Sequence, residues 1–259
     1  DAESRDVAAI AAHALGLERP TTWTGHVPTG VFNDVIAGER KEHELPGSGY
    51  RRHQTVPTPD LSAMTALLSG HEVIAYLPFD GHMNDAYENI KTTCTGTLAY
   101  HDAYFGKGID FNKGFITLND VRFTTQSFSV AFWLKASPLR VTAADPGLIS
   151  NKDWQNGSNK GFILSYRGTK DIKFNVGDGL KNRIDYTRIL PTNYDQGWMH
   201  VILTVDRERR KVRIYYDFIF EENEAEISDA LADTSFDSMN LNIGQDGTGV
   251  LQYALPAQM

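Results

Sequence analysis

The chain has 259 residues, and 25 lysines and arginines against 33 aspartates and glutamates give it a formal net charge of −8. This acidity disfavours nucleic acid as a partner, because nucleic-acid-binding proteins normally carry a basic field. The single cysteine excludes an intrachain disulfide and a cysteine-based zinc cluster. No stretch approaches the roughly 20 apolar residues of a membrane span. The N-terminal residues also lack the apolar core of a signal peptide.

The first 70 residues combine a helical pattern with an irregular one. In residues 5–17 the apolar side chains recur at helical spacing, with Asp6 placed to cap the helix and Gly16 to end it. Residues 33–70 are rich in Gly, Pro, Thr, His and charge, which is typical of an irregular connector. Within this connector a second short helix is predicted over residues 59–69.

From residue 71 onward the hydrophobic period changes from 3.6 to 2. Apolar and other side chains alternate in SFSVAFWLK (residues 127–135) and in WMHVILTVD (residues 198–206). Further short apolar runs, each bounded by turn residues, are IAYLPF, GIDF, FITL, GLIS, GFILSY, DIKFNV, KVRIYY and LNIG. Roughly ten short strands without helical crossovers predict an all-β sandwich or barrel with antiparallel sheets.

In their order along the chain, these segments resemble a laminin-G-like, concanavalin A-like jelly roll. The matching pieces are IAYLPFDGHMND, YFGKGIDF with GFITL, FSVAFWLK, GLISNKDW with GFILSY, WMHVILTVDRERRKVRIYYD, and LNIGQDGTG. The resemblance implies a mainly β, two-sheet antiparallel sandwich over residues 71–259. In this family a further strand that begins with acidic residues normally follows. We therefore expect the natural polypeptide to continue, because a missing strand leaves an open sheet edge.

The first 32 residues resemble a different family. DVAAIAAHALGLERPTTWTGHVPTGVF is similar to the last helix and tail of the alkaline-phosphatase superfamily, which includes type I phosphodiesterases and sulfatases. The resemblance implies that residues 1–32 are the end of a catalytic domain whose nucleophile and metal ligands lie upstream. That upstream domain would then be a partner of the sandwich.

No catalytic set is recognisable in the sequence. Cys94 lies in a Thr-rich turn or edge strand and is interpreted as a filler rather than a nucleophile. The histidines are dispersed, and His200, which the resemblance places on a core strand, is expected to be structural. A retaining glycosidase needs two carboxyl groups about 5 Å apart. The densest acidic stretch, residues 221–229, lacks strand alternation and is interpreted as a solvated loop.

The turn FDGHMND is a candidate calcium site. Asp80, Gly81, Asn84 and Asp85 offer the hard oxygen ligands that calcium prefers, and the laminin-G resemblance implies a structural calcium at this place. The alternative is a turn rich in Asp and Asn. Asp246, in GQDGTG, is a second candidate, with a turn again as the alternative.

The loop around Trp154 is the candidate ligand site. A large aromatic ring is unexpected in the polar segment NKDWQNGSNKG unless it packs or binds something. Indole faces suit the C–H surfaces of sugars, and Asp153, Gln155 and Asn156 could reach hydroxyl groups. The alternative is that Trp154 pins its loop against the sandwich. Asn156-Gly157-Ser158 fits a glycosylation sequon, but we favour a tight turn.

Three further segments are interpreted as structural. Trp133 and Trp198 lie in predicted strands and are expected to pack in the core or between the sheets. The basic run from Asp206 to Arg213 is predicted to form a charged hairpin that joins two strands, with an anion-binding patch as the alternative.

Together these patterns predict a non-catalytic, carbohydrate-binding or accessory module of an exported bacterial protein, in the periplasm or at the cell surface. One alternative is the C-terminal part of a metal-dependent phosphodiesterase, phosphatase or sulfatase. The other is a structural domain that mediates protein contacts.

Overall fold

The computed structural model describes residues 73–111, 113–136, 145–167, 171–191, 197–217, 224–251, 255 and 257–259. The predicted helices of residues 5–17 and 59–69, and the segments 1–32 and 33–70, lie outside the described residues. Residues 74–259 form one compact unit. In the part of the chain that the structure describes, no helix has the length and apolar character to cross a membrane.

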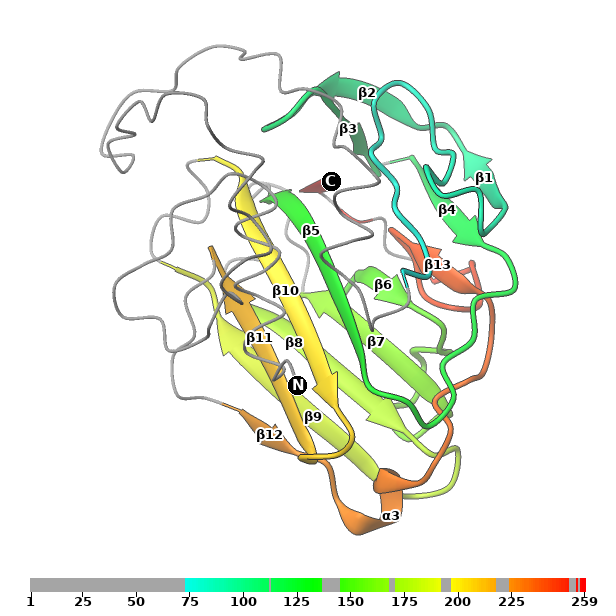
Figure 1. Ribbon diagram of the computed structural model, residues 1–259, viewed down its shortest axis with the longest axis vertical. Helices are drawn as coiled ribbons and strands as arrows, with labels where there is room; N and C mark the ends of the chain where they lie inside the picture. The colour runs from blue at the N-terminus through cyan, green and yellow to red at the C-terminus, as the bar shows by residue number, and fades with distance from the viewer. Residues whose placement is uncertain are drawn as a thin grey trace, which may run out of the picture. The chain divides into compact units, whose positions relative to one another are not determined.

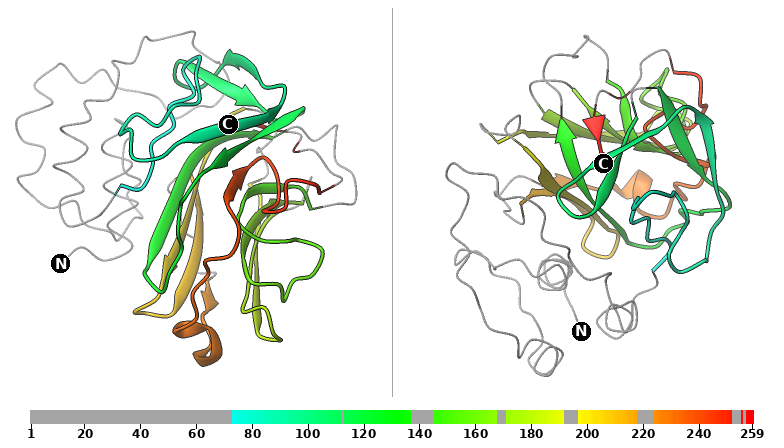
Figure 2. Two further views of the ribbon diagram at one scale, coloured as in Figure 1. Left: turned by 90° about the vertical axis from the view of Figure 1, so that its right-hand side faces the viewer. Right: turned by 90° about the horizontal axis from the view of Figure 1, so that it is seen from above.

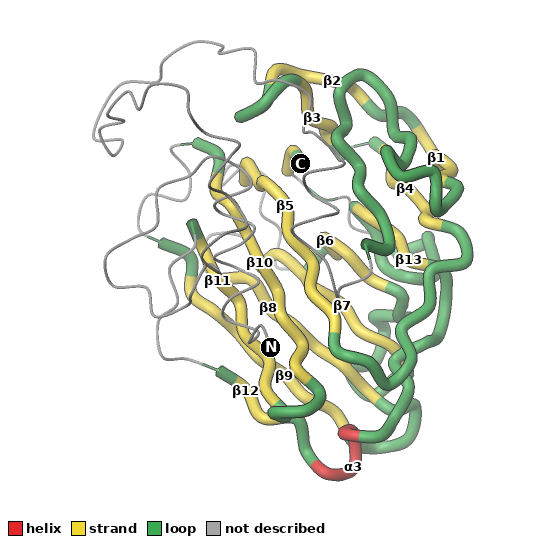
Figure 3. Tube along the Cα trace, viewed as in Figure 1, coloured by secondary structure: helices red, strands yellow, loops and turns green. Residues whose placement is uncertain are grey.

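Two seven-stranded antiparallel sheets pack as a sandwich (Figures 1 and 2). The first sheet has the order β1 (Thr92–Gly96), β4 (Gly114–Leu118), β13 (Leu241–Ile243), β6 (Gly147–Ser150), β7 (Gly161–Tyr166), β8 (Asp171–Gly177) and β9 (Arg183–Ile189). The second has the order β12 (Ala225–Glu226), β11 (Lys211–Tyr216), β10 (Met199–Asp206), β5 (Phe128–Ala136), β14 (Ala257–Gln258), β3 (Lys107–Asp110) and β2 (Ala99–Asp102). Within the described residues the helical content is one turn, α3 (Asp229–Ala232), as Figure 3 shows. The predicted mainly β, two-sheet antiparallel sandwich is confirmed.

The core lies between the two sheets and follows the alternation of the sequence. Phe162, Leu164 and Tyr166 of β7 point inward and are fully buried. The same period places every second residue of β8 and β10 in the core, in the set Ile172, Phe174, Val176, Val201, Leu203 and Val205. Burial of each such side chain contributes about 1.5–3 kcal/mol to stability. Because a shift by one residue would expose the whole apolar set of a strand, the period of two fixes which face of each sheet points into the core.

The charged hairpin is confirmed between β10 and β11, where Asp206 pairs with Lys211. Arg207, in the turn of this hairpin, is buried. Its Nη1 donates to the carbonyl oxygens of Leu231 at 2.8 Å and Ala232 at 3.1 Å. The Arg207 guanidinium therefore adds a donor to the last carbonyl groups of α3, where helical carbonyls lose their regular partners. The hairpin is a structural element that joins the second sheet to α3.

The segment IAYLPF, predicted as a strand, is not one. Residues 74–79 lie outside the strands of both sheets, and Phe79 adopts a positive φ of 57°. The backbone N–H of Tyr76 donates to the Asp85 carboxylate at 2.8 Å, and its carbonyl accepts from Ala86 N–H. The segment thus bonds to the following loop rather than to a neighbouring strand.

The expectation that Trp133 packs in the core is wrong. It lies on the face of β5 opposite to the buried Leu134 and is not a member of the inter-sheet core. Its ring stacks on Tyr104 with centroids 4.0 Å apart. Trp198 is half-buried and lies just before β10 rather than within it.

Candidate functional site

A pocket of about 380 Å³ opens on the outer face of the first sheet. Its lining residues come from five separate parts of the chain and are Asp145, Trp154, Gly157, Lys173, Arg183, Asp185 and Leu251. The polar side chains of β8 and β9 reach this face because they alternate with the buried apolar side chains of the same strands. The pocket therefore combines an aromatic ring with several charged groups on a rigid sheet.

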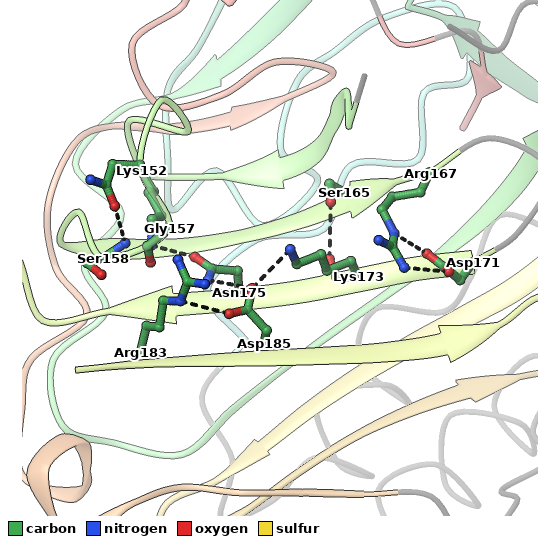
Figure 4. Close-up of polar contacts among 11 residues, drawn as sticks. Lys152, Gly157, Ser158, Ser165, Arg167, Asp171, Lys173, Asn175, Arg183 and Asp185 are labelled. Carbon is green, nitrogen blue, oxygen red and sulfur yellow. Dashed lines mark hydrogen bonds and ion pairs between the residues drawn. The ribbon is translucent and has the colours of Figure 1, made fainter. Parts of the chain in front are cut away.

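The floor of the pocket is a polar network centred on Asp185 (Figure 4). Its carboxylate accepts from Lys173 Nζ at 2.9 Å, Arg183 Nε at 2.9 Å and Asn175 Nδ2 at 3.1 Å. Burial by itself would raise the pKa of Asp185. The hydrogen bond and charge of Lys173, with the contributions of Asn175 and Arg183, outweigh burial and hold that pKa below its ordinary value. Asp185 is therefore a carboxylate whose role is to orient two cations.

Lys152 lies beneath this network and connects the Trp154 loop to the sheet. The side chain is fully buried, and Nζ donates to the Gly157 carbonyl at 2.7 Å and to Asn175 Oδ1 at 2.5 Å. Burial lowers the pKa of Lys152 to about 7. A lysine in this place ties the loop backbone to β8.

Trp154 is half-buried and stands at the wall of the pocket. Its backbone N–H donates to Asp246 Oδ2 at 3.1 Å. The Lys173 ammonium lies 5.1 Å from the centroid of its ring, within the range of a cation–π contact. The ring is thus both held by its loop and exposed to the pocket.

Asp246 has the structural role that was considered as the alternative to a metal ligand. It is almost fully buried, and Oδ1 accepts from Thr248 Oγ1 at 2.6 Å, Thr248 N–H at 3.1 Å and Gly249 N–H at 3.2 Å. With the bond from Trp154, both carboxylate oxygens are engaged in organising two loops.

Trp154 lines the pocket, whereas the other predicted ligand residues do not appear in its lining. Asp153 Oδ1 accepts from Gln155 N–H at 2.9 Å, and Gln155 is exposed. The exposed Asn156 forms the expected turn, because Oδ1 accepts from Ser158 N–H at 2.9 Å. Asp145, Lys173, Arg183 and Asp185 line the pocket although none of them was predicted from the sequence. The signal that could have found the last three was the polar alternation within β8 and β9.

The structure spreads the predicted calcium ligands between two environments. Asp80, Gly81 and Asn84 are exposed, with Gly81 in a turn at φ 86°. Asp85 is buried, and its two oxygens accept four backbone N–H groups, from Tyr76, Tyr87, Asn89 and Ile90. Among the described residues, no group of three or more His, Cys, Asp or Glu side chains is arranged to hold a metal. Calcium binding stays a prediction.

Cys94 and His200 lie away from the pocket. Cys94 is exposed on the edge strand β1. His200 is buried on β10, where its backbone N–H donates to Asp217 Oδ1 at 2.9 Å. Burial lowers the pKa of His200 to about 4, so the imidazole is neutral at physiological pH.

Residues 110–256 match the Laminin_G_3 family, described as the concanavalin A-like lectin/glucanases superfamily. This match covers more than half of the chain, so the chain belongs to that family. No curated protein sequence matches the chain.

Similar solved structures include receptor-binding domains of botulinum neurotoxins. One is a structure of botulinum neurotoxin type C, whose cell entry is described as dependent on interaction with two ganglioside molecules. It has a TM-score of 0.56 at 11% identity, over 75% of this chain and 47% of that one. The binding domain of neurotoxin DC in complex with rat synaptotagmin II has a TM-score of 0.51 at 12% identity, over 66% and 42%. The chain therefore spans less than half of these domains, and the likeness is one of fold.

Proposed function

We propose that this domain is a non-catalytic carbohydrate-binding module of an exported bacterial protein, and that the pocket beside Trp154 holds the sugar. The observation that carries the proposal is the half-buried indole at the wall of a pocket with charged side chains on its floor. An indole face packs on the C–H groups of a pyranose, while ammonium, guanidinium and carboxylate groups bond to its hydroxyls.

Membership of a lectin and glucanase superfamily supports binding of a glycan. One similar structure is of a neurotoxin whose cell entry depends on interaction with two ganglioside molecules, and a second is a neurotoxin binding domain in complex with SialylT. The non-catalytic part of the proposal rests on the absence, from the sequence, of a paired-carboxylate motif for glycoside hydrolysis. A hydrolase domain upstream of residues 1–32 and an export route to the periplasm or cell surface remain predictions.

A glycan array tests the proposal, with the whole chain applied once in calcium and once in chelator. We expect the wild-type protein to bind at least one class of glycan, and Trp154→Ala to lose about tenfold or more in affinity. Tyr104→Ala is the matched control, because it removes an exposed aromatic ring outside the pocket. Thermal melting curves verify that both variants are folded.

The proposal is wrong if the wild-type chain binds no glycan in either buffer, or if Trp154→Ala binds as tightly as the wild type. Product analysis of the bound glycans tests the non-catalytic part, since cleavage that depends on a pocket carboxylate would make the domain an enzyme.

A further inference from the structure

The charged groups of the pocket are separated along β8. The register of β8 and β9 places Arg183 opposite Gly177, at the C-terminal end of β8. Asp145 lies toward the other end, because the carbonyl of its neighbour Pro146 accepts a bond from Tyr166 N–H, and Tyr166 pairs with the start of β8. The pocket therefore has a carboxylate at one end and a guanidinium at the other, with Lys173 between them.

The carboxylate on the floor offers little to a ligand. Asp185 already accepts from Lys173, Asn175 and Arg183 at 2.9–3.1 Å. A carboxylate that is engaged in this way orients its cations and has few lone pairs left for a sugar hydroxyl. The floor of the pocket therefore presents mainly N–H donors to a ligand.

Arg183 is the most accessible of these donors. Its side chain is 50% exposed, and Asp185 engages its Nε. Nη1 lies against Gly157, where a Cβ atom would come within 2.6 Å of it. Asp185 thus fixes the guanidinium through Nε, and its terminal nitrogens can bond two oxygens of a carboxylate or sulfate group, the paired geometry in which arginine binds oxyanions.

From this arrangement we infer that the pocket binds an acidic sugar, with the ring on Trp154 and the carboxylate or sulfate group at Arg183. The inference rests on the proposed glycan-binding function and adds the chemical class of the ligand. Asp145, at the far end of the pocket, accepts hydrogen bonds from the hydroxyl groups of the sugar. The positive charge of Lys173, on the floor of the pocket, attracts the acidic group.

Isothermal titration of the whole chain tests the inference with two matched pairs of probes. The first pair is trigalacturonate and its methyl ester, which lacks the charge, and the second is a sulfated galactan oligosaccharide and its desulfated form. We expect one acidic probe to bind about tenfold or more tighter than its neutral partner, since bonds to charged groups exceed neutral ones by this factor. The pair in which the acidic probe binds more tightly than its neutral partner shows whether the pocket prefers a carboxylate or a sulfate group. The preference should weaken as NaCl rises from about 50 mM to about 500 mM.

Arg183→Gln should remove the preference for the acidic probe while retaining the melting temperature within a few degrees. Arg122→Gln is the control, because it makes the same charge change at an arginine of similar exposure outside the pocket. Equal affinity for acidic and neutral probes, with binding still lost in Trp154→Ala, would overturn the acidic-sugar inference and leave the proposed function standing. Absence of binding to any glycan would reject both. An acidic preference that Arg183→Gln retains would also overturn the assignment of Arg183.

Discussion

The backbone N–H of Trp154 donates to the carboxylate of Asp246 at 3.1 Å, across 92 positions of sequence. Asp246 in turn accepts three bonds from Thr248 and Gly249 in its own loop. One buried carboxylate therefore holds the aromatic loop between β6 and β7 to the loop that follows β13. The orientation of the indole depends on this tie as well as on Lys152.

Asp246→Ala should lower both stability and ligand binding. The change leaves several N–H and O–H groups without an acceptor, which costs about 2–3 kcal/mol of unfolding free energy. We expect glycan affinity to fall about tenfold in protein that is still folded, because the Trp154 loop loses its anchor. Urea unfolding and titration measure the two effects. Asp178→Ala, at a more exposed turn that also accepts backbone N–H groups, should cost less than about 1 kcal/mol.

Two glycines near the pocket should respond differently to alanine. At Gly157 the added Cβ meets the flexible end of Arg183, at 2.6 Å from Nη1. Gly157→Ala should therefore displace the guanidinium, weaken binding of an acidic glycan and cost about 1 kcal/mol of stability. At Gly247 the Cβ would lie 2.4 Å from the backbone nitrogen of Lys152. Gly247→Ala should lower the unfolding free energy by about 3 kcal/mol or more, since backbone cannot move aside. Equal losses of stability in the two variants would contradict this account.

The buried Lys152 should make stability rise with pH. Burial lowers its pKa to about 7 in the folded state, whereas in the unfolded chain it titrates near about 10.4. Between these values the unfolded state binds a proton that the folded state has released, so the unfolding free energy increases as pH increases. Urea unfolding from pH 6 to pH 9 should show this slope in the wild type.

Lys152→Met should remove that pH slope, and it should also lower stability, because Asn175 Oδ1 and the Gly157 carbonyl lose their donor. Lys181→Met, at an exposed lysine, is the matched control and should keep the wild-type slope. If the unfolding free energies of Lys152→Met and the wild type change in parallel with pH, Lys152 is not the titrating group.

Substitutions at Asp85 and Asp80 should show whether their loop has a structural role alone or also binds calcium. Asp85→Asn places an amide where four backbone N–H groups converge. It should cost about 1–3 kcal/mol, equally in calcium and in chelator. Calcium binding at the exposed residues requires that calcium raise the melting temperature of the wild type but not that of Asp80→Asn. Equal melting temperatures of the wild type in the two buffers would reject the calcium prediction.

Alternation in the sequence was enough to predict the fold class. β5, β7, β8 and β10 each place apolar side chains at every second position, and these residues form the core. The strands β2, β9, β12 and β14 were not predicted, and the Thr-rich segment of β1 was left as either a turn or an edge strand, because such short, Thr-rich or charged segments give a weak hydrophobic signal. In β9, Arg183 and Asp185 alternate with the buried Ile184 and Tyr186, but Arg188 takes the next inward position and the apolar Ile189 is exposed, which disguises the period of two.

Local chemistry also identified one member of the site. Trp154 was predicted to bind a ligand because a large ring is unusual in a polar loop, and it does line the pocket. Asp153, Gln155 and Asn156 were selected by proximity in sequence. In the structure, Asp153 and Asn156 bond to the backbone of their own turn.

The period of two and the polar turn around Trp154 are properties of the sequence alone, and they determined the fold class and one pocket residue. The rest of the pocket was decided by tertiary structure. Asp185 meets Lys173 and Asn175 because β8 and β9 pair in one register, and a shift by one residue would turn these groups to the other face. Asp246 reaches Trp154 because β13 lies next to β6 in the sheet. Such contacts depend on strand order, which neighbouring residues along the chain do not specify.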